Sequence, residues 1–162
     1  MSETIWQEAQ DVLQAEGAAI LSVATSEALA GPFASAVETI LACTGQVIMT
    51  GVGKAGIIGE KISATMASTG TASIVLHPVE ALHGDLGRVS RGDVVVALSN
   101  SGSSEEIVRL LDHLKRIGAS VIAVTGDADS PLGRHADITL NYGQFAEACP
   151  LGAAPSVSTT VM

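Results

Sequence analysis

The sequence contains few aromatic residues and few basic ones. Aromatic side chains make up 2% of its 162 residues, so Ala, Val, Ile and Leu must build the core of a chain that is 47% hydrophobic. This composition suits α/β layering, and the length fits one domain with a sizeable core. There are 8 lysines and arginines against 17 acidic residues, for a formal net charge of −9. A nucleic-acid partner is therefore not expected, because basic side chains neutralise phosphate backbones. A small phosphorylated ligand needs only a local site.

The sequence also lacks disulfide, secretion and membrane signals. Its two cysteines, Cys43 and Cys149, are far apart and are expected to be reduced thiols. The start, MSETIWQEAQ, has neither the basic residues nor the apolar stretch of a signal peptide. No apolar run approaches the roughly 20 residues that span a bilayer. We therefore expect a cytoplasmic protein without membrane association.

Helical periodicity dominates residues 1–44. Residues 2–30 are predicted to form one long or two shorter helices, ended by Gly31-Pro32, and residues 33–43 a second amphipathic helix. These helices precede the alternating segments, so we expect them to serve packing or oligomer contacts.

Strand and helix patterns alternate over residues 45–162. This order predicts an α/β fold, a three-layer αβα sandwich with a five-stranded parallel sheet in the flavodoxin-like order 2-1-3-4-5. The final residues look like a helix start, but one turn is too short to hold itself as a helix. Predicted strands are 46–50, 72–76, 94–99, 120–125 and 138–141; predicted helical segments are 57–68, 79–86 (short or irregular), 104–117 and 131–135.

A hydroxyl-rich turn follows the third predicted strand. It contains Ser99, Asn100, Ser101, Gly102, Ser103 and Ser104, and the next helix begins immediately after it. Serine hydroxyls and the free N–H groups of a helix start can together hold an anionic group. The simpler alternative is an ordinary N-cap, with Glu105 and Glu106 compensating the helix dipole.

A second turn, residues 51–56, follows the first predicted strand. In the order 2-1-3-4-5, strand order reverses between strands one and three, so both turns should border the crevice where ligands bind. Neither a dinucleotide fingerprint nor a P-loop fits this turn. Its Lys54 could bind a phosphate or polarise a hydroxyl, or it could be a solvated loop lysine.

Four other residues could carry chemistry. His77 and His83 could act as acid, base or metal ligand, although structural loop histidines are the plainer interpretation. Glu106 and Glu147 could transfer protons at a carbon next to a carbonyl. Alternatively, Glu106 could compensate a helix dipole, and Glu147 could be an acid on a surface loop. No cluster of His and Cys at zinc spacing supports an all-protein metal site.

Five motifs occur in order: GVGK-x-G from Gly51, ASTGT from Ala67, HPVEALHGDLG from His77, SNSG from Ser99 and EACPLG from Glu147. From about Gly45 to its end, the sequence resembles the sugar isomerase (SIS) domain of arabinose 5-phosphate isomerases. The resemblance implies interconversion of D-ribulose 5-phosphate and D-arabinose 5-phosphate through a cis-enediol intermediate. It also implies a place in the pathway to the eight-carbon acid sugar (KDO) of lipopolysaccharide or capsule.

The resemblance implies roles for particular residues. Lys54, Glu106 and Glu147 would be catalytic, and His83 would contact substrate and assist. No cofactor would be required, but His77 could bind an inhibitory zinc ion. A homodimer or homotetramer is expected. The residues implied to line the sugar-phosphate pocket are Gly53, Gly70, Thr71, His83, Ser99, Asn100, Ser101 and Ser104.

The sequence departs from the family pattern in several places. Ala55 stands where a serine is usual, and Ser103 replaces a common glutamate. The sequence ends about where the last core helix of the family begins, so we expect a truncated or shortened chain that lacks a later catalytic histidine and CBS domains. The alternatives are a non-catalytic sugar-phosphate sensor or binding module, and an isomerase of another sugar phosphate, such as a heptose or hexulose phosphate.

Overall fold

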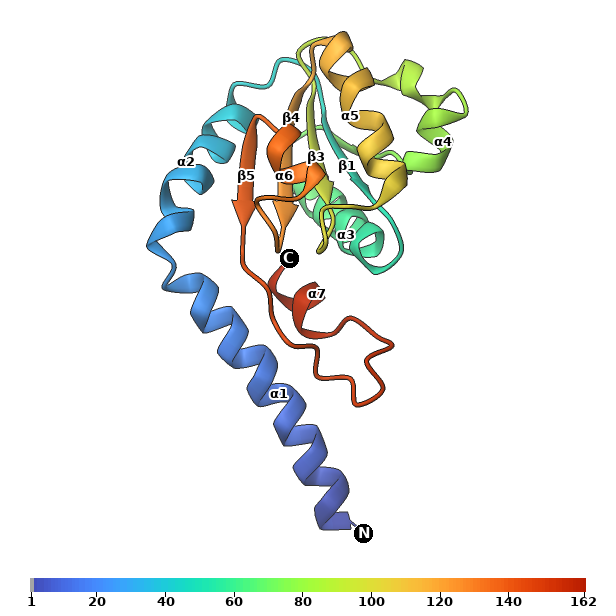
Figure 1. The fold of residues 1–162 in the computed structure, drawn as a ribbon. Helices are drawn as coiled ribbons and strands as arrows, with labels where there is room; N and C mark the ends of the chain where they lie inside the picture. Colours follow the sequence, from blue (N-terminus) through green and yellow to red (C-terminus); the bar gives the residue numbers. More distant parts are fainter. Residues whose placement is uncertain (1) are drawn as a thin grey trace.

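One parallel sheet organises the computed structural model, which describes residues 2–162 (Figure 1). The strand order is β2-β1-β3-β4-β5, which confirms the predicted order. Each predicted strand is present, with ends shifted by at most one residue. The strands are β1 (Val47–Gly51), β2 (Ser73–Val75), β3 (Val94–Leu98), β4 (Ser120–Thr125) and β5 (Ile138–Asn141).

The two central strands explain where the site lies. Every residue of β1 and β3 is buried, as expected for parallel strands covered on both faces. Their pairing runs from Val47 beside Val94 to Gly51 beside Leu98. The two strands therefore end at the same level, so the turns that follow them meet at one edge of the sheet.

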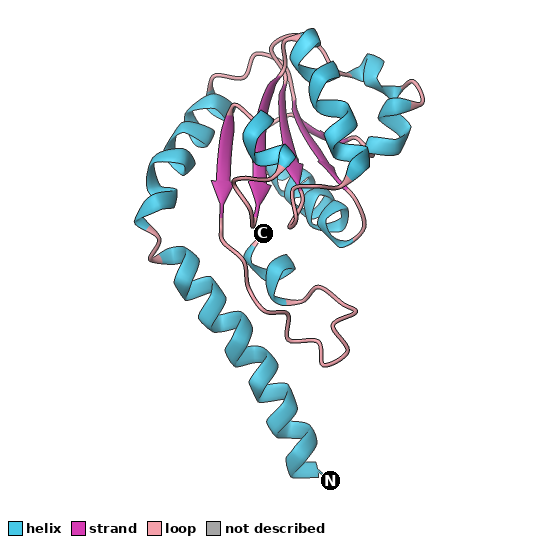
Figure 2. Ribbon diagram, in the orientation of Figure 1, coloured by secondary structure: helices cyan, strands magenta, loops and turns pink. Residues whose placement is uncertain are grey.

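Helices cover both faces of the sheet, as Figure 2 shows. One apolar cluster joins Ile48, Val95 and Ala123 to residues of α4, α5 and α6. The other joins Met49 and Val96 to residues of α2 and α3. The three-layer prediction is thus confirmed. The helices after β1 are α3 (Lys54–Ser68), α4 (Pro78–Leu82), the 3-10 helix η1 (Asp85–Arg88), α5 (Glu105–Ile117), α6 (Pro131–His135) and α7 (Val157–Val161).

The N-terminal helices break at a different place from the predicted one. Helix α1 spans Ser2–Ala24 and α2 spans Glu27–Leu41, with Ser26 in extended conformation between them. Gly31-Pro32 lies inside α2, so the predicted break there is wrong. Proline removes the hydrogen bond to the carbonyl four residues earlier and its ring crowds that carbonyl, and burial of Ala36 against the sheet helps to offset this cost.

Most large side chains on α1 and α2 stay exposed. Trp6, Leu13 and Leu21 on α1 are about 60% or more accessible, as is Leu41 on α2. Within residues 2–162, no single helix is long and apolar enough to cross a membrane; α1 and α2 meet that length and composition test only as a pair bent by 74°.

The C-terminal residues form a helix that the sequence did not predict. Helix α7 has only five residues, too few to be stable alone. It packs against α1 and α3, with Val157 and Ser158 buried, and tertiary contacts therefore replace the missing intrinsic stability. Figure 1 shows α1 running past this segment, away from the sheet.

Candidate active site

A cavity of about 240 Å³ lies at the carboxyl edge of β1 and β3. This is the predicted crevice, where strand order reverses and where ligands bind in open α/β sheets. Three segments supply its walls: the turn after β1, the turn after β3 and the C-terminal residues around α7. The lining residues are Val52, Lys54, Ala55, Leu98, Ser99, Asn100, Ser101, Ser104, Pro155, Ser158, Thr159 and Met162.

The turn after β3, residues 99–104, is called here the serine loop. Its Ser99 and Ser104 hydroxyl oxygens lie 3.0 Å apart, and the Gly102 N–H donates to the Ser99 carbonyl. Gly102 has φ +60°, and a Cβ there would lie 1.9 Å from the Ser130 hydroxyl oxygen. Only glycine fits this position, so the loop is tightly packed against the neighbouring β4–α6 turn.

Asn100 is held from the neighbouring strands. The Tyr142 hydroxyl donates to the Asn100 Oδ1 over 2.8 Å, and the Gly126 N–H donates to the Asn100 carbonyl. Burial, together with the negative charge of Glu147, raises the pKa of Tyr142. Tyr142 therefore stays protonated and remains a donor. The structure brings Ser99, Asn100, Ser101 and Ser104 to the cavity together, at the start of the thirteen-residue helix α5.

Lys54 lines the cavity from the turn after β1. It is the first residue of α3 and is exposed, and Gly53 before it has φ +60°. The close approach of Gly51 to Gly56 keeps the turn tight, because a Cβ on Gly51 would lie 2.9 Å from the Gly56 nitrogen. Lys54 therefore brings a positive charge to the same cavity as the serine loop, although Gly53 itself does not line the cavity.

The third wall was not predicted. Pro155, Ser158, Thr159 and Met162 line the cavity from the C-terminal segment. The hydroxyl-rich stretch Ser156–Thr160 was the available signal, since it resembles the serine loop in composition. The sequence suggested only a helix start there, because nothing local shows that these residues return to the sheet edge.

Glu147 anchors this third wall. Its Oε2 accepts hydrogen bonds from the Ser156 N–H (2.7 Å), the Ser156 hydroxyl (3.3 Å) and the Ser158 N–H (3.4 Å). Burial raises the pKa of Glu147, but hydrogen bonding from Ser158 and Ser156 outweighs it and leaves the pKa below its ordinary value. The Ser158 hydroxyl contributes to this lowering, although it makes no hydrogen bond of standard geometry to any described residue. Glu147 is thus ionised at neutral pH.

Glu106 lies in the first turn of α5, two residues beyond Ser104, and is half-buried. It does not line the cavity itself. Its neighbour Glu105 pairs instead with Arg109 on the exposed side of the helix. Glu106 and Glu147 therefore flank the cavity-lining segments without forming the cavity wall.

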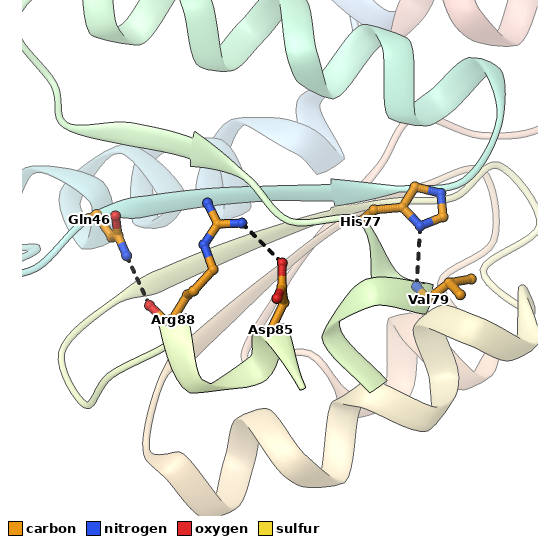
Figure 3. A network of polar contacts seen from close by, with 5 residues as sticks. All are labelled: Gln46, His77, Val79, Asp85 and Arg88. Atoms are coloured by element: carbon orange, nitrogen blue, oxygen red, sulfur yellow. Dashed lines mark hydrogen bonds and ion pairs between the residues drawn. The ribbon is translucent and has the colours of Figure 1, made fainter. Parts of the chain in front are cut away.

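The two histidines lie outside the cavity and are exposed. His77 precedes α4, and its Nδ1 accepts a hydrogen bond from the Val79 N–H over 3.3 Å (Figure 3). His83 ends the same helix. Asp85 pairs with Arg88 at 3.5 Å within η1. His83 does not line this cavity in the described chain, and its contact with substrate stays a prediction.

Gly70 and Thr71 lie at the opposite edge of the sheet. They precede β2, beside Gly45 and the start of β1, and they border shallow hollows there. The parallel strands place the serine loop at the carboxyl edge and the turn before β2 at the amino edge. Within the described chain, Gly70 and Thr71 therefore do not line the cavity beside the serine loop, and their role in a sugar-phosphate pocket stays a prediction.

Metal ligands do not converge in the described part of the chain. Within residues 2–162, no three His, Cys, Asp or Glu side chains are placed to hold an ion. His77 would offer zinc a single ligand. Both cysteines are free thiols.

The comparisons with known proteins agree with this arrangement. Residues 40–162 match the model of the SIS domain family. The chain is 52% identical over 129 residues to arabinose 5-phosphate isomerase KdsD of Pseudomonas aeruginosa, covering 80% of this chain and 40% of the relative. It is 51% identical over 128 residues to KdsD of Escherichia coli K12, covering 79% and 39%. The chain thus spans about 40% of the length of these relatives.

A solved structure extends the comparison to the whole fold. The c3406 protein of E. coli CFT073, in complex with arabinose 5-phosphate, superposes with a TM-score of 0.94 at 39% identity, covering 99% of this chain and 85% of that one. The agreement in sequence and in overall fold supports one assignment. The chain belongs to the SIS domain family.

Proposed function

We propose that this chain interconverts D-ribulose 5-phosphate and D-arabinose 5-phosphate. The observation that carries the proposal is the likeness to the c3406 protein, which is solved with arabinose 5-phosphate and covers nearly the whole chain. The cavity fits such a ligand in character, because it joins one lysine to several hydroxyls at the edge of a parallel sheet.

The serine loop would hold the phosphate. Ser99, Ser101 and Ser104 present hydroxyl groups at the start of α5, where free N–H groups and the helix dipole favour negative charge. Lys54 adds a full positive charge from the facing turn. No metal or cofactor is required in this proposal, and zinc bound at His77 would inhibit.

Proton transfer would follow a cis-enediol route. In the ketose-to-aldose direction, a carboxylate removes a proton from C1 while O2 takes up a proton. The enediol then loses the proton on O1 as C2 receives one. Lys54 would stabilise the negative charge that develops on oxygen. We propose Glu106 as the base, because its carboxylate accepts no hydrogen bond from residues 2–162 whereas Glu147 is occupied at α7.

The test is turnover of D-ribulose 5-phosphate by this exact chain in deuterated water. We expect D-arabinose 5-phosphate that carries solvent deuterium at C2, and we expect both signals to vanish in Glu106→Gln. Glu105→Gln is the matched control, since this residue points to Arg109 instead. Binding of the sugar phosphate without exchange would instead indicate a binding or sensor module.

We also propose that the protein is a homo-oligomer. The exposed apolar residues of α1 and α2, such as Trp6, Leu13 and Leu41, support contact with another copy. Light scattering after gel filtration should give a mass of two or four chains, and Leu13→Glu should reduce it. A monomeric wild type would contradict this proposal.

A cytoplasmic location and a role in supplying the KDO of lipopolysaccharide or capsule would follow from the reaction. Both are proposals that rest on the isomerase activity. Deletion of the coding sequence in its host, followed by supplementation with D-arabinose 5-phosphate, would test the pathway.

A further inference from the structure

One buried hydroxyl group in the cavity wall has no hydrogen bond of standard geometry. Ser158 is 1% exposed, and its Oγ makes no such bond to any described residue, although the hydroxyl lies near enough to the Glu147 carboxylate to help lower its pKa. A buried hydroxyl left unsatisfied costs about 1–3 kcal/mol, so such groups are normally paired. Because Ser158 lines the cavity, a ligand bound there could supply the missing partner.

The position of Ser158 depends on Glu147. The Glu147 carboxylate accepts hydrogen bonds from the backbone N–H groups of Ser156 and Ser158, and the Ala148 N–H donates to the Ser156 hydroxyl over 3.1 Å. These bonds join the loop after β5 to the first turn of α7. The intervening residues 150–155 are exposed, and the backbone N–H groups of residues 151–154 turn back towards Cys149.

We propose that Glu147 is a positioning residue, which holds α7 so that the Ser158 hydroxyl binds a hydroxyl or carbonyl oxygen of the sugar. This inference rests on the proposed function only in taking the cavity as a sugar-phosphate site. It assigns Glu147 a different role from the catalytic one that the resemblance implied.

The surroundings of Ser158 favour the sugar over the phosphate as its partner. Its hydroxyl lies on the wall held by the Glu147 carboxylate, whose charge would repel a phosphate dianion. The groups suited to a phosphate, Lys54 and the serine loop, lie on the other two walls. A serine hydroxyl can both donate and accept, which is what sugar hydroxyls require.

The experiment measures equilibrium binding by calorimetry for the whole chain. Inorganic phosphate is one probe. The second probe is the sugar phosphate that binds the wild type most tightly among D-arabinose 5-phosphate, D-ribulose 5-phosphate and D-glucose 6-phosphate. The test therefore does not depend on which sugar is the substrate. The variants are Ser158→Ala, Glu147→Ala and Glu147→Gln. Thr160→Ala is the control, because its hydroxyl bonds the Ser156 carbonyl on the exposed side of α7.

Ser158→Ala and Glu147→Ala should each weaken sugar-phosphate binding about tenfold, the effect of one lost hydrogen bond, and leave phosphate binding within about twofold. The double variant should lose less than the product of the two effects, because Glu147 acts through Ser158. Glu147→Gln should restore binding to within about threefold, since its amide oxygen still accepts both N–H groups. Thr160→Ala should bind like the wild type.

Three results would overturn the proposal. They are unchanged sugar-phosphate binding in Ser158→Ala, equal weakening of both probes, and a Glu147→Gln variant that binds normally but turns over more than about a hundredfold more slowly. The last would make Glu147 a direct proton carrier. A wild type that binds a sugar phosphate without turning it over refutes the proposed function alone, and the binding comparison still decides the role of Glu147.

Discussion

The serine loop and the C-terminal segment 143–162 form facing parts of one cavity, but they are held in different ways. The serine loop follows a fully buried strand, and backbone hydrogen bonds join it to Gly126 and Leu132. The C-terminal segment is largely exposed before α7, and it is held by the hydrogen bonds of Glu147 and by the packing of α7 against α1 and α3. The comparison indicates that the wall proposed to bind the phosphate is part of the sheet edge, whereas the wall proposed to bind the sugar is held by a short helix and one carboxylate.

The largest expected effect comes from Gly102 in the serine loop. Gly102→Ala would force a Cβ into the Ser130 hydroxyl at positive φ, and should cost about 3 kcal/mol of unfolding free energy. Denaturant unfolding measures this loss, and binding of inorganic phosphate should fall with it. Gly31→Ala is the control, because a Cβ on this helical glycine meets nothing within 4 Å. Equal stability of the two variants would show that the serine loop is more adaptable than the structure indicates.

Substitution of Lys54 tests the role of the turn after β1 in catalysis without disturbing the fold. Lys54→Gln should lower kcat/KM for D-ribulose 5-phosphate about a hundredfold, because a charge opposite the developing oxyanion is lost. The melting temperature should stay unchanged, since Lys54 is exposed. Lys61→Gln on the same helix should have no effect on turnover. A similar loss in both variants would point to general electrostatic attraction instead.

Ser104 should give a smaller effect. Ser104→Ala removes the 3.0 Å contact with the buried Ser99 hydroxyl and one cavity hydroxyl, so inorganic phosphate should bind about tenfold more weakly. Isothermal calorimetry provides the measurement. Ser103 does not line the cavity and only donates to the Ser101 hydroxyl, so Ser103→Ala should weaken phosphate binding less than Ser104→Ala does. The prediction fails if Ser103→Ala weakens phosphate binding as much as Ser104→Ala does.

The smallest effect concerns the pH dependence of the C-terminal anchor. The pKa of Glu147 is lowered in the folded chain, so its stabilising contribution is present above the ordinary value of 4.5 and disappears as pH falls through the folded pKa. The difference in melting temperature between wild type and Glu147→Gln should therefore be constant near neutral pH and shrink at acidic pH. A difference that grows on acidification would contradict the anchoring role.

The fold was largely predictable because its signals are local. Continuous apolar runs such as Val94–Leu98 indicated buried parallel strands, and their alternation with helices predicted the strand order. The strand order in turn located the cavity between the turns after β1 and β3. The helix break near Ser26 was missed, because Gly31-Pro32 carries a stronger local break signal than the sequence around Ser26.

The site was only partly predictable. Lys54 and the serine loop were found because their turns stand out in composition. Ser158 was missed, and Thr71 lies at the other edge of the sheet from the cavity, since motif order does not tell which edge a residue reaches. Glu147 was predicted as a catalytic group, while the structure places its carboxylate at the start of α7.

The amino-acid sequence by itself determined the buried strands, the amphipathic helix α5 and the tight turns, because periodicity and glycine act over a few residues. Only the tertiary structure decided that α7 exists and that Ser158 reaches the cavity. A five-residue helix has no stability of its own, so its formation depends on the nearby Glu147 and on contacts with α1 and α3, which are distant in the sequence.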